Sequence, residues 1–145
     1  MRVCRPDRRF NDGVRKKGNM MHKILLVDDE AQVRTLLRIT LEHDGYDVEE
    51  AVNGRQALAL YEEQPVDLVI TDIAMPEMNG FDLIEVLTRR FVDIKVIAMS
   101  GLAENLAVAK LLGACEAVQK PLNIDQLLRM VSAELAQPLR IHTGG

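Results

Sequence analysis

The sequence predicts an α/β fold, an open and doubly wound parallel sheet of five strands flanked by five helices. From residue 22 onward, five short aliphatic runs alternate with segments whose apolar residues recur at helical spacing. The runs are apolar throughout, as expected of parallel strands buried on both faces, and helical crossovers are what join parallel neighbours. Five such units are too few to close an eightfold barrel, so an open sheet is expected.

The first unit combines a strand over residues 23–27 with a helix. The strand is an unbroken aliphatic run, and the apolar residues after it, from Val33 to Leu41, fall at helical spacing. The helix is expected to stop near Gly45, because glycine readily takes the left-handed conformation that ends helices. The second strand is predicted over residues 46–52.

The second helix and the third strand follow the same alternation. Asn53 and Gln56 form a capping pair at the start of a helix that runs through Glu63. The third strand is predicted over residues 67–71 and is followed, after the loop 73–80, by a helix with one apolar face.

The last two units complete the sheet. Strands are predicted over residues 94–99 and 114–119, with a helix over residues 102–112 between them. Asn123 is predicted to cap the final helix, which Pro138 breaks.

Five polar residues stand at the carboxyl ends of these strands. They are Asp28 and Asp29 after the first strand, Asp72 at the end of the third, Ser100 at the end of the fourth and Lys120 at the end of the fifth. Ligands of open α/β sheets bind at this edge, where the strand order reverses. If the first and third strands are neighbours, as in the order 2-1-3-4-5, the three carboxylates converge and need a compensating cation.

The chemistry of these residues points to Mg²⁺ and a phosphoryl group. Mg²⁺ binds through one or two carboxylates, water and a phosphate oxygen. Lys120 can supply a point charge and Ser100 a hydroxyl donor to phosphoryl oxygens, and an aspartate can accept the phosphoryl group. In the alternative interpretation Asp28 and Asp29 are helix caps and Lys120 is a structural ion-pair partner, which leaves five coincidences to explain separately.

Composition limits the other functions. The 145 residues are close to the ~150 of one domain. No segment reaches the ~18 consecutive apolar residues of a membrane span. Aromatic residues make up 3% of the chain, there is no Trp and the net charge is −4, so direct nucleic-acid binding is not expected. In the absence of an export signal, a cytoplasmic protein is expected.

The charge is divided unevenly along the chain. Residues 1–20 carry a net charge of +5, and the remaining 125 residues carry −9. We expect the segment 1–20 to be a disordered tail or a non-native extension, since Met20 or Met21 could be the natural start; an electrostatic arm is the alternative. The predicted domain covers residues 21–138 and leaves a short tail, residues 139–145.

Four segments together resemble the receiver domain of bacterial two-component response regulators, the CheY-like fold. They are Leu26-Val27-Asp28-Asp29-Glu30, the stretch from Asp72 to Gly80, Ala98-Met99-Ser100-Gly101, and Gln119-Lys120-Pro121. The resemblance covers about residues 22–137 and includes both the order and the spacing of the segments.

The resemblance implies a role for each polar residue at the strand ends. Asp72 would be the phosphoacceptor, Asp29 a direct Mg²⁺ ligand, Asp28 a ligand mainly through water, and the carbonyl of Ala74 a further ligand. Ser100 and Lys120 would occupy the family's hydroxyl and lysine positions. The phosphoryl group would come from a phosphohistidine on a sensor histidine kinase or a histidine phosphotransfer protein.

Phosphorylation would then draw Ser100 inward and alter a surface that binds a downstream protein. By resemblance, this surface is built by the helix 102–112, the strand 114–119 and the last helix, and it includes Leu102, Leu106 and Leu111, each of which could instead be a core contact. Receiver domains usually have Tyr or Phe three residues before the strand-five lysine, but here that position is Ala117. The aromatic part of the switch is therefore missing.

Our interpretation of the sequence is a stand-alone receiver that is not a turnover enzyme. Two other interpretations compete with it. The chain could be a receiver cut from a longer, DNA-binding response regulator, and the length of the gene would decide this. An aspartyl-phosphate hydrolase needs a second aspartate two residues after the nucleophile, and that position is Ala74.

Overall fold

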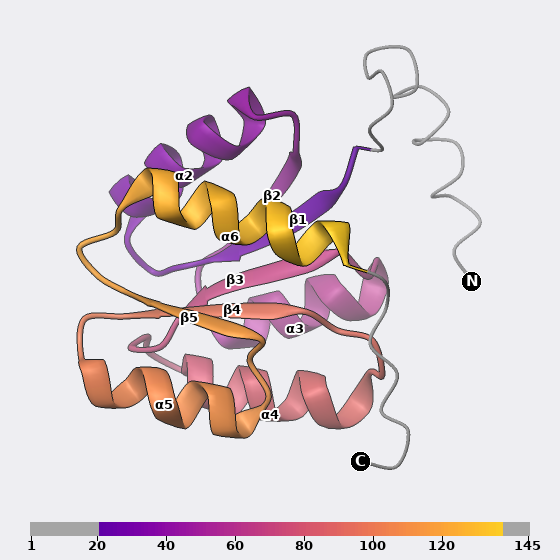
Figure 1. The fold of residues 1–145 in the computed structure, drawn as a ribbon. Helices are drawn as coiled ribbons and strands as arrows, with labels where there is room; N and C mark the ends of the chain where they lie inside the picture. Colours follow the sequence, from indigo (N-terminus) through magenta and orange to yellow (C-terminus); the bar gives the residue numbers. More distant parts are fainter. Residues whose placement is uncertain (1–20, 138–145) are drawn as a thin grey trace.

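The computed structural model describes residues 21–137 and shows a single parallel sheet in the order β2-β1-β3-β4-β5 (Figure 1). Its strands are β1 (Lys23–Val27), β2 (Asp47–Ala51), β3 (Leu68–Asp72), β4 (Val96–Ser100) and β5 (Glu116–Gln119). The predicted fold class and strand order are confirmed. The predicted tails, residues 1–20 and 139–145, lie outside the described residues.

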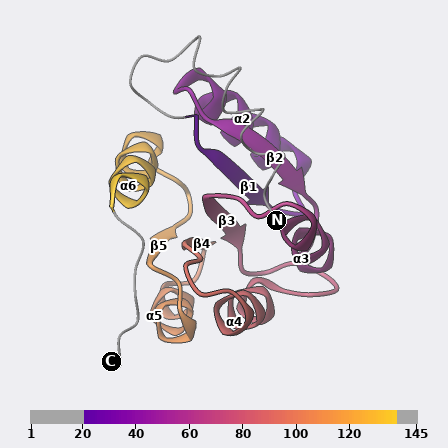
Figure 2. The same ribbon diagram turned by 90° about the vertical axis from the view of Figure 1, so that its right-hand side faces the viewer.

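Five helices cover the two faces of the sheet among the described residues (Figure 2). They are α2 (Ala31–His43), α3 (Gly54–Glu63), α4 (Gly80–Arg90), α5 (Ala103–Leu112) and α6 (Ile124–Ala136). Helices α2 and α6 pack on one face, and α3, α4 and α5 pack on the other. None of the helices between residues 21 and 137 is long and apolar enough to cross a bilayer.

Alternate residues of each strand supply the two halves of the core. In β1, Ile24 and Leu26 pack toward α2 and α6, whereas Leu25 and Val27 pack toward α3 and α4. All four side chains are completely buried. Burial on both faces explains why the strands are aliphatic throughout.

Asparagine caps start three of the helices. The side chains of Asn53, Asn79 and Asn123 accept hydrogen bonds from backbone N–H groups three residues further on, at 2.8, 2.9 and 3.0 Å. The predicted caps at Asn53 and Asn123 are confirmed. Helix α2 ends just before Gly45, whose φ of +98° is the left-handed conformation predicted there.

The strands end where the site requires. Asp72 and Ser100 are the last residues of β3 and β4, as predicted. Each is held in the ladder, Asp72 opposite Met99 and Ser100 opposite Gln119. Their side chains therefore project from ordered backbone at the carboxyl edge of the sheet.

Candidate functional site

The strand order brings three carboxylates together at the carboxyl edge of the sheet. Strands β1 and β3 are neighbours with Val27 opposite Thr71, so Asp28 and Asp72 are the next residues on adjacent strands. Carboxylate oxygens of Asp28, Asp29 and Asp72 all lie within 4.8 Å of one another. The predicted convergence of these carboxylates is confirmed.

Asp28 is completely buried and is bound at every polar atom. Its N–H donates to the carbonyl of Ala51 at 3.2 Å, its Oδ1 accepts from the N–H of Glu30 at 2.9 Å, and its Oδ2 lies 3.2 Å from Lys120 Nζ. The residue that caps α2 is Glu30, which makes no side-chain capping bond. Interpreting Asp28 as a cap of this helix is therefore wrong.

Lys120 follows β5 and reaches across the edge of the sheet to both buried carboxylates. Its Nζ lies 3.2 Å from Asp28 Oδ2 and 3.3 Å from Asp72 Oδ1. Burial by itself would lower the pKa of Lys120, but attraction to the charges of Asp28 and Asp72 outweighs it, and the net effect raises this pKa. The ammonium group therefore stays charged at neutral pH.

Asp72 has only 6% of its surface exposed. Burial raises the pKa of its carboxyl group because it disfavours the charged form, and the nearby charge of Asp28 raises this pKa further, against the opposing effect of Lys120. A single lysine among three carboxylates leaves net negative charge at the site. A divalent cation would relieve that excess.

Two glycines allow the loop after Asp72 to pack tightly. A β carbon on Gly80 would lie 2.3 Å from the backbone oxygen of Asp72, and one on Gly54 would lie 2.5 Å from the backbone oxygen of Met78. The N–H of Gly80 also donates to the carbonyl of Ile73 at 2.9 Å. The loop that contains Ala74 is thus held against both the end of β3 and the start of α3.

Ser100 is nearly buried, and its hydroxyl oxygen faces the start of α5. It accepts hydrogen bonds from the N–H of Leu102 at 3.1 Å and from the side-chain amide of Asn105 at 3.0 Å. Ala117 lies opposite Ala98 in β4 and packs, half-buried, against the core.

The three leucines that were predicted to lie on the surface for a downstream protein differ in exposure. Leu102 is 57% exposed and Leu111 is 86% exposed, so neither is a core contact, whereas Leu106 is half-buried. The residue of α5 that is fully buried is Ala109.

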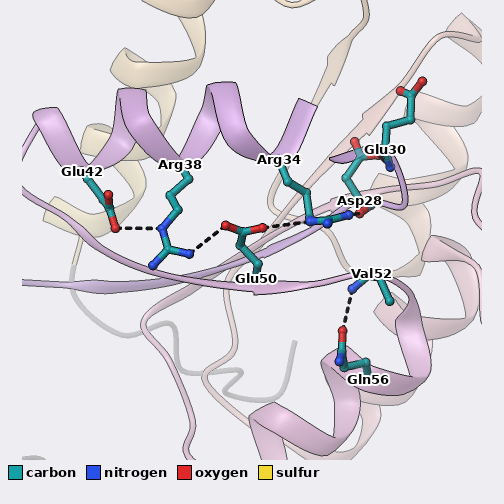
Figure 3. Close-up of polar contacts among 8 residues, drawn as sticks. All are labelled: Asp28, Glu30, Arg34, Arg38, Glu42, Glu50, Val52 and Gln56. Atoms are coloured by element: carbon teal, nitrogen blue, oxygen red, sulfur yellow. Dashed lines mark hydrogen bonds and ion pairs between the residues drawn. The ribbon is translucent and has the colours of Figure 1, made fainter. Parts of the chain in front are cut away.

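The sequence pattern does not single out Arg34, which lies on α2 and points toward Asp28 (Figure 3). Its Nη1 donates to the backbone carbonyl of Asp28 at 2.8 Å, and its Nε donates to Glu50 of β2 at 2.9 Å. A charged residue in an amphipathic helix usually lies in solvent, so its sequence position carries no sign of this contact. Asn105, the partner of Ser100, is a polar residue of α5 whose sequence position likewise carries no sign of its contact.

The three carboxylates fit a hard divalent cation. Mg²⁺ prefers oxygen ligands and is commonly held by one or two carboxylates with water completing its shell. Asp29 is exposed to solvent, whereas Asp28 and Asp72 are buried, so a cation bound here would have protein oxygens on one side and water on the other. Softer ligands such as Cys or His are not part of the cluster, which argues against zinc.

The sequence matches a family model described as the response regulator receiver domain over residues 24–132. The chemotaxis protein CheY of Bacillus subtilis strain 168 is 34% identical over 119 residues, which cover 80% of this chain and 99% of that protein. The response regulator GtcR of Aneurinibacillus migulanus is 38% identical over 120 residues, covering 80% of this chain but 48% of GtcR. The chain thus spans nearly all of one relative and about half of the other.

Solved structures of response regulator proteins have the same fold as this chain. A CheY-like receiver domain protein from Methanospirillum hungatei superposes with a TM-score of 0.75 at 32% identity, over 79% of this chain and 94% of that one. The response regulator TrrA from Thermotoga maritima, solved in complex with Mg²⁺ and BeF, has a TM-score of 0.74 at 33% identity, over 79% of this chain and 99% of that one.

Proposed function

This chain belongs to the receiver-domain family of two-component response regulators, and we propose that it is a stand-alone phosphorylation switch with Asp72 as its phosphoacceptor. One observation carries the proposal. Asp72 lies at the edge of the sheet, in a cluster with Asp28 and Asp29 and 3.3 Å from Lys120 Nζ. Receiver domains are signalling proteins rather than turnover enzymes.

In the proposed reaction, a carboxylate oxygen of Asp72 attacks the phosphorus of a phosphohistidine on a kinase or phosphotransfer protein. A new O–P bond forms, the N–P bond breaks, and the imidazole leaves with the bonding electron pair and takes up a proton. Lys120, whose Nζ lies 3.3 Å from Asp72 Oδ1, would bind a phosphoryl oxygen through its charged ammonium group. The carboxylates of Asp28, Asp29 and Asp72 and the carbonyl of Ala74 would hold Mg²⁺, which would neutralise charge on the phosphoryl oxygens.

The proposed switch is the Ser100 hydroxyl. After phosphorylation it would move toward Asp72 and donate to a phosphoryl oxygen, and this movement would weaken the bonds that it accepts from Leu102 and Asn105. Because Ala117 has no ring that could turn inward, the change would reach the surface through the loop after Ser100 and through α5. The proposed contact surface for a downstream protein combines α5, β5 and α6, with Leu102 and Leu111 exposed on it.

The alternative is a receiver that acts on an output domain of a longer regulator. CheY of B. subtilis, which this chain matches over 99% of its length, supports the stand-alone proposal. GtcR, matched over 48% of its length, and the NtrX-like regulators of Rickettsia, matched over about a quarter, favour the alternative. The length of the reading frame in its genome decides between them.

The decisive test is a phosphorylation experiment in vitro. The protein and an Asp72→Asn variant are incubated with a small acyl phosphate donor and Mg²⁺, and their intact masses are measured. We expect the mass of one phosphoryl group to be added to the wild type and not to the variant. A wild type that gains no phosphoryl group, or a variant that gains as much, would refute the proposal.

A further inference from the structure

Arg34 contacts the backbone of Asp28, and this contact points to a role in orienting the acidic cluster rather than in binding a ligand directly (Figure 3). We propose that Arg34 is a positioning residue of the Mg²⁺ site, because it holds the peptide group that joins Asp28 to Asp29. This inference rests on the proposed function, since it assumes that the acidic cluster binds Mg²⁺.

The guanidinium group of Arg34 connects the end of β1 to β2. Its Nη1 donates to the Asp28 carbonyl at 2.8 Å, and its Nε donates to Glu50 Oε1 at 2.9 Å. The side chain of Arg34 is 15% exposed and that of Glu50 is 26% exposed, so both bonds are partly shielded from water. Two bonds in the fixed plane of one guanidinium group leave it little freedom to turn.

The bond to the Asp28 carbonyl matters most for Asp29. The carbonyl of Asp28 and the N–H of Asp29 belong to the same planar peptide group, so holding that oxygen also sets the direction in which Asp29 leaves the strand. Asp28 has its own anchors, because its carboxylate is bound by the Glu30 N–H and by Lys120.

The carboxylate of Asp29 has no comparable contacts within the described part of the chain. Its side chain is exposed, and no hydrogen bond or ion pair to its carboxylate is found among residues 21–137. The place of this carboxylate therefore depends on the backbone that carries it. Without Arg34, the peptide group between Asp28 and Asp29 would be held only by the bond from the Glu30 N–H to Asp28 Oδ1 that spans it, and Asp29 would spend less time within reach of the cation.

Helix α2 also supplies a matched control. Arg38 lies one turn after Arg34 and binds the other oxygen of the same carboxylate, with Nη1 at 2.7 Å from Glu50 Oε2. Its Nε pairs with Glu42 at 3.0 Å, and it makes no contact with Asp28 (Figure 3). The two arginines thus share their helix and their main partner but differ in the contact that the inference depends on.

The experiment measures Mg²⁺ binding by calorimetry in the wild type, Arg34→Met and Arg38→Met, and the urea midpoint of each protein without metal. We expect Arg34→Met to bind Mg²⁺ about 10-fold more weakly, as is typical when a group that orients a metal ligand is lost. Arg38→Met is expected to change the affinity by less than about twofold. In phosphorylation by an acyl phosphate, the half-saturating Mg²⁺ concentration should rise for Arg34→Met, while the final extent at saturating Mg²⁺ stays that of the wild type.

Equal affinities in Arg34→Met and the wild type, or equal losses in both variants, would overturn the inference. If Arg34→Met does not fold, Arg34→Lys and Arg38→Lys are judged by the same comparison, since an ammonium group cannot make both bonds of the guanidinium fork. A wild type that binds no Mg²⁺ would instead refute the metal site of the proposed function. The two failures are therefore distinguishable.

Discussion

The side-chain amide of Asn105 donates a 3.0 Å hydrogen bond to the hydroxyl oxygen of Ser100. The N–H of Leu102 donates to the same oxygen at 3.1 Å. In the unphosphorylated protein this oxygen is thus occupied by donors from the loop after β4 and the first turn of α5. We expect a movement of the hydroxyl toward Asp72 to weaken these bonds.

The Asn105→Ala variant should make that movement easier. Removing one neutral hydrogen bond of about 1 kcal/mol from the resting state should tighten binding of beryllofluoride, a phosphoryl mimic, by about fivefold. Titration with beryllofluoride in Mg²⁺, followed by NMR shifts of Ser100, measures this affinity. Glu104→Ala, an exposed change in the same helical turn, is the control. Unchanged or weaker binding in Asn105→Ala would contradict the expectation.

Gly80→Ala should disturb the loop after Asp72. The new β carbon would lie 2.3 Å from the Asp72 oxygen and 2.7 Å from the Ile73 α carbon, so the backbone must shift. We expect a loss of about 1–3 kcal/mol in the free energy of unfolding, measured in urea, and weaker Mg²⁺ binding. Gly101→Ala is the matched control because nothing lies within 4 Å of its β carbon. Similar stabilities for the two variants would show that the close contact is easily relieved.

The stability of the Lys120→Met variant should depend more on Mg²⁺ than that of the wild type. The lysine neutralises Asp28 and Asp72, so without metal the variant should lose about 1–3 kcal/mol, less than for a fully buried pair because Lys120 is 22% exposed. Added Mg²⁺ should raise its thermal midpoint more than that of the wild type, since lysine and metal compete for the same carboxylates.

Lys110→Met provides the comparison for this prediction. Lys110 is an exposed lysine paired with Glu116 at 3.7 Å, and its loss should leave the effect of Mg²⁺ unchanged. A smaller Mg²⁺ effect in Lys120→Met than in the wild type would rule out the competition.

Glu50 should make stability depend on pH in a defined direction. Hydrogen bonds from Arg38 and Arg34 hold its pKa below the usual value of 4.5. A lowered pKa in the folded state means that the carboxylate stabilises the protein above pH 4.5, and that this contribution disappears as the pH falls through the folded-state pKa. It amounts to no more than about 1 kcal/mol, since solvent screens partly exposed pairs.

The measurement is urea unfolding of the wild type and Glu50→Gln in EDTA between pH 7 and pH 3. The difference in unfolding free energy should be largest near neutrality and should shrink below pH 4.5. In a background that carries both Arg34→Met and Arg38→Met, the same substitution should show little of this dependence. A difference that grows toward low pH would reverse the expected sign.

The features predicted correctly from the sequence are those whose causes lie close together in the chain. A strand buried on both faces must be apolar along its length, as residues 23–27 are. The caps at Asn53 and Asn123 connect residues three apart and need no distant partner. The convergence of Asp28 and Asp72 is the exception, because these residues are distant in the chain: it follows from a parallel sheet in which the first and third strands are neighbours.

The side of α5 that faces the sheet could not be predicted from the sequence. The helix is apolar around most of its surface, and in the structure Ala109 is buried whereas Leu111 is 86% exposed. Periodicity in such a helix does not identify the side that faces the sheet. That choice is made by packing against α4, β4 and β5, whose placement around α5 is set by the folded sheet and not by the periodicity of the helix itself.

The amino-acid sequence by itself therefore determined the α/β fold class and the residues of the acidic cluster, because periodicity and strand-end chemistry are local properties of the chain, whereas the strand order was expected from the resemblance to receiver domains. Only the tertiary structure decided how that cluster is held. Arg34 meets Glu50 across 16 residues, and Lys120 meets Asp28 across 92. The strand-end pattern brings Lys120 to the same edge as Asp28, but which atoms meet there depends on the relative placement of whole helices and strands, and the contacts of Arg34 have no sign in the sequence pattern.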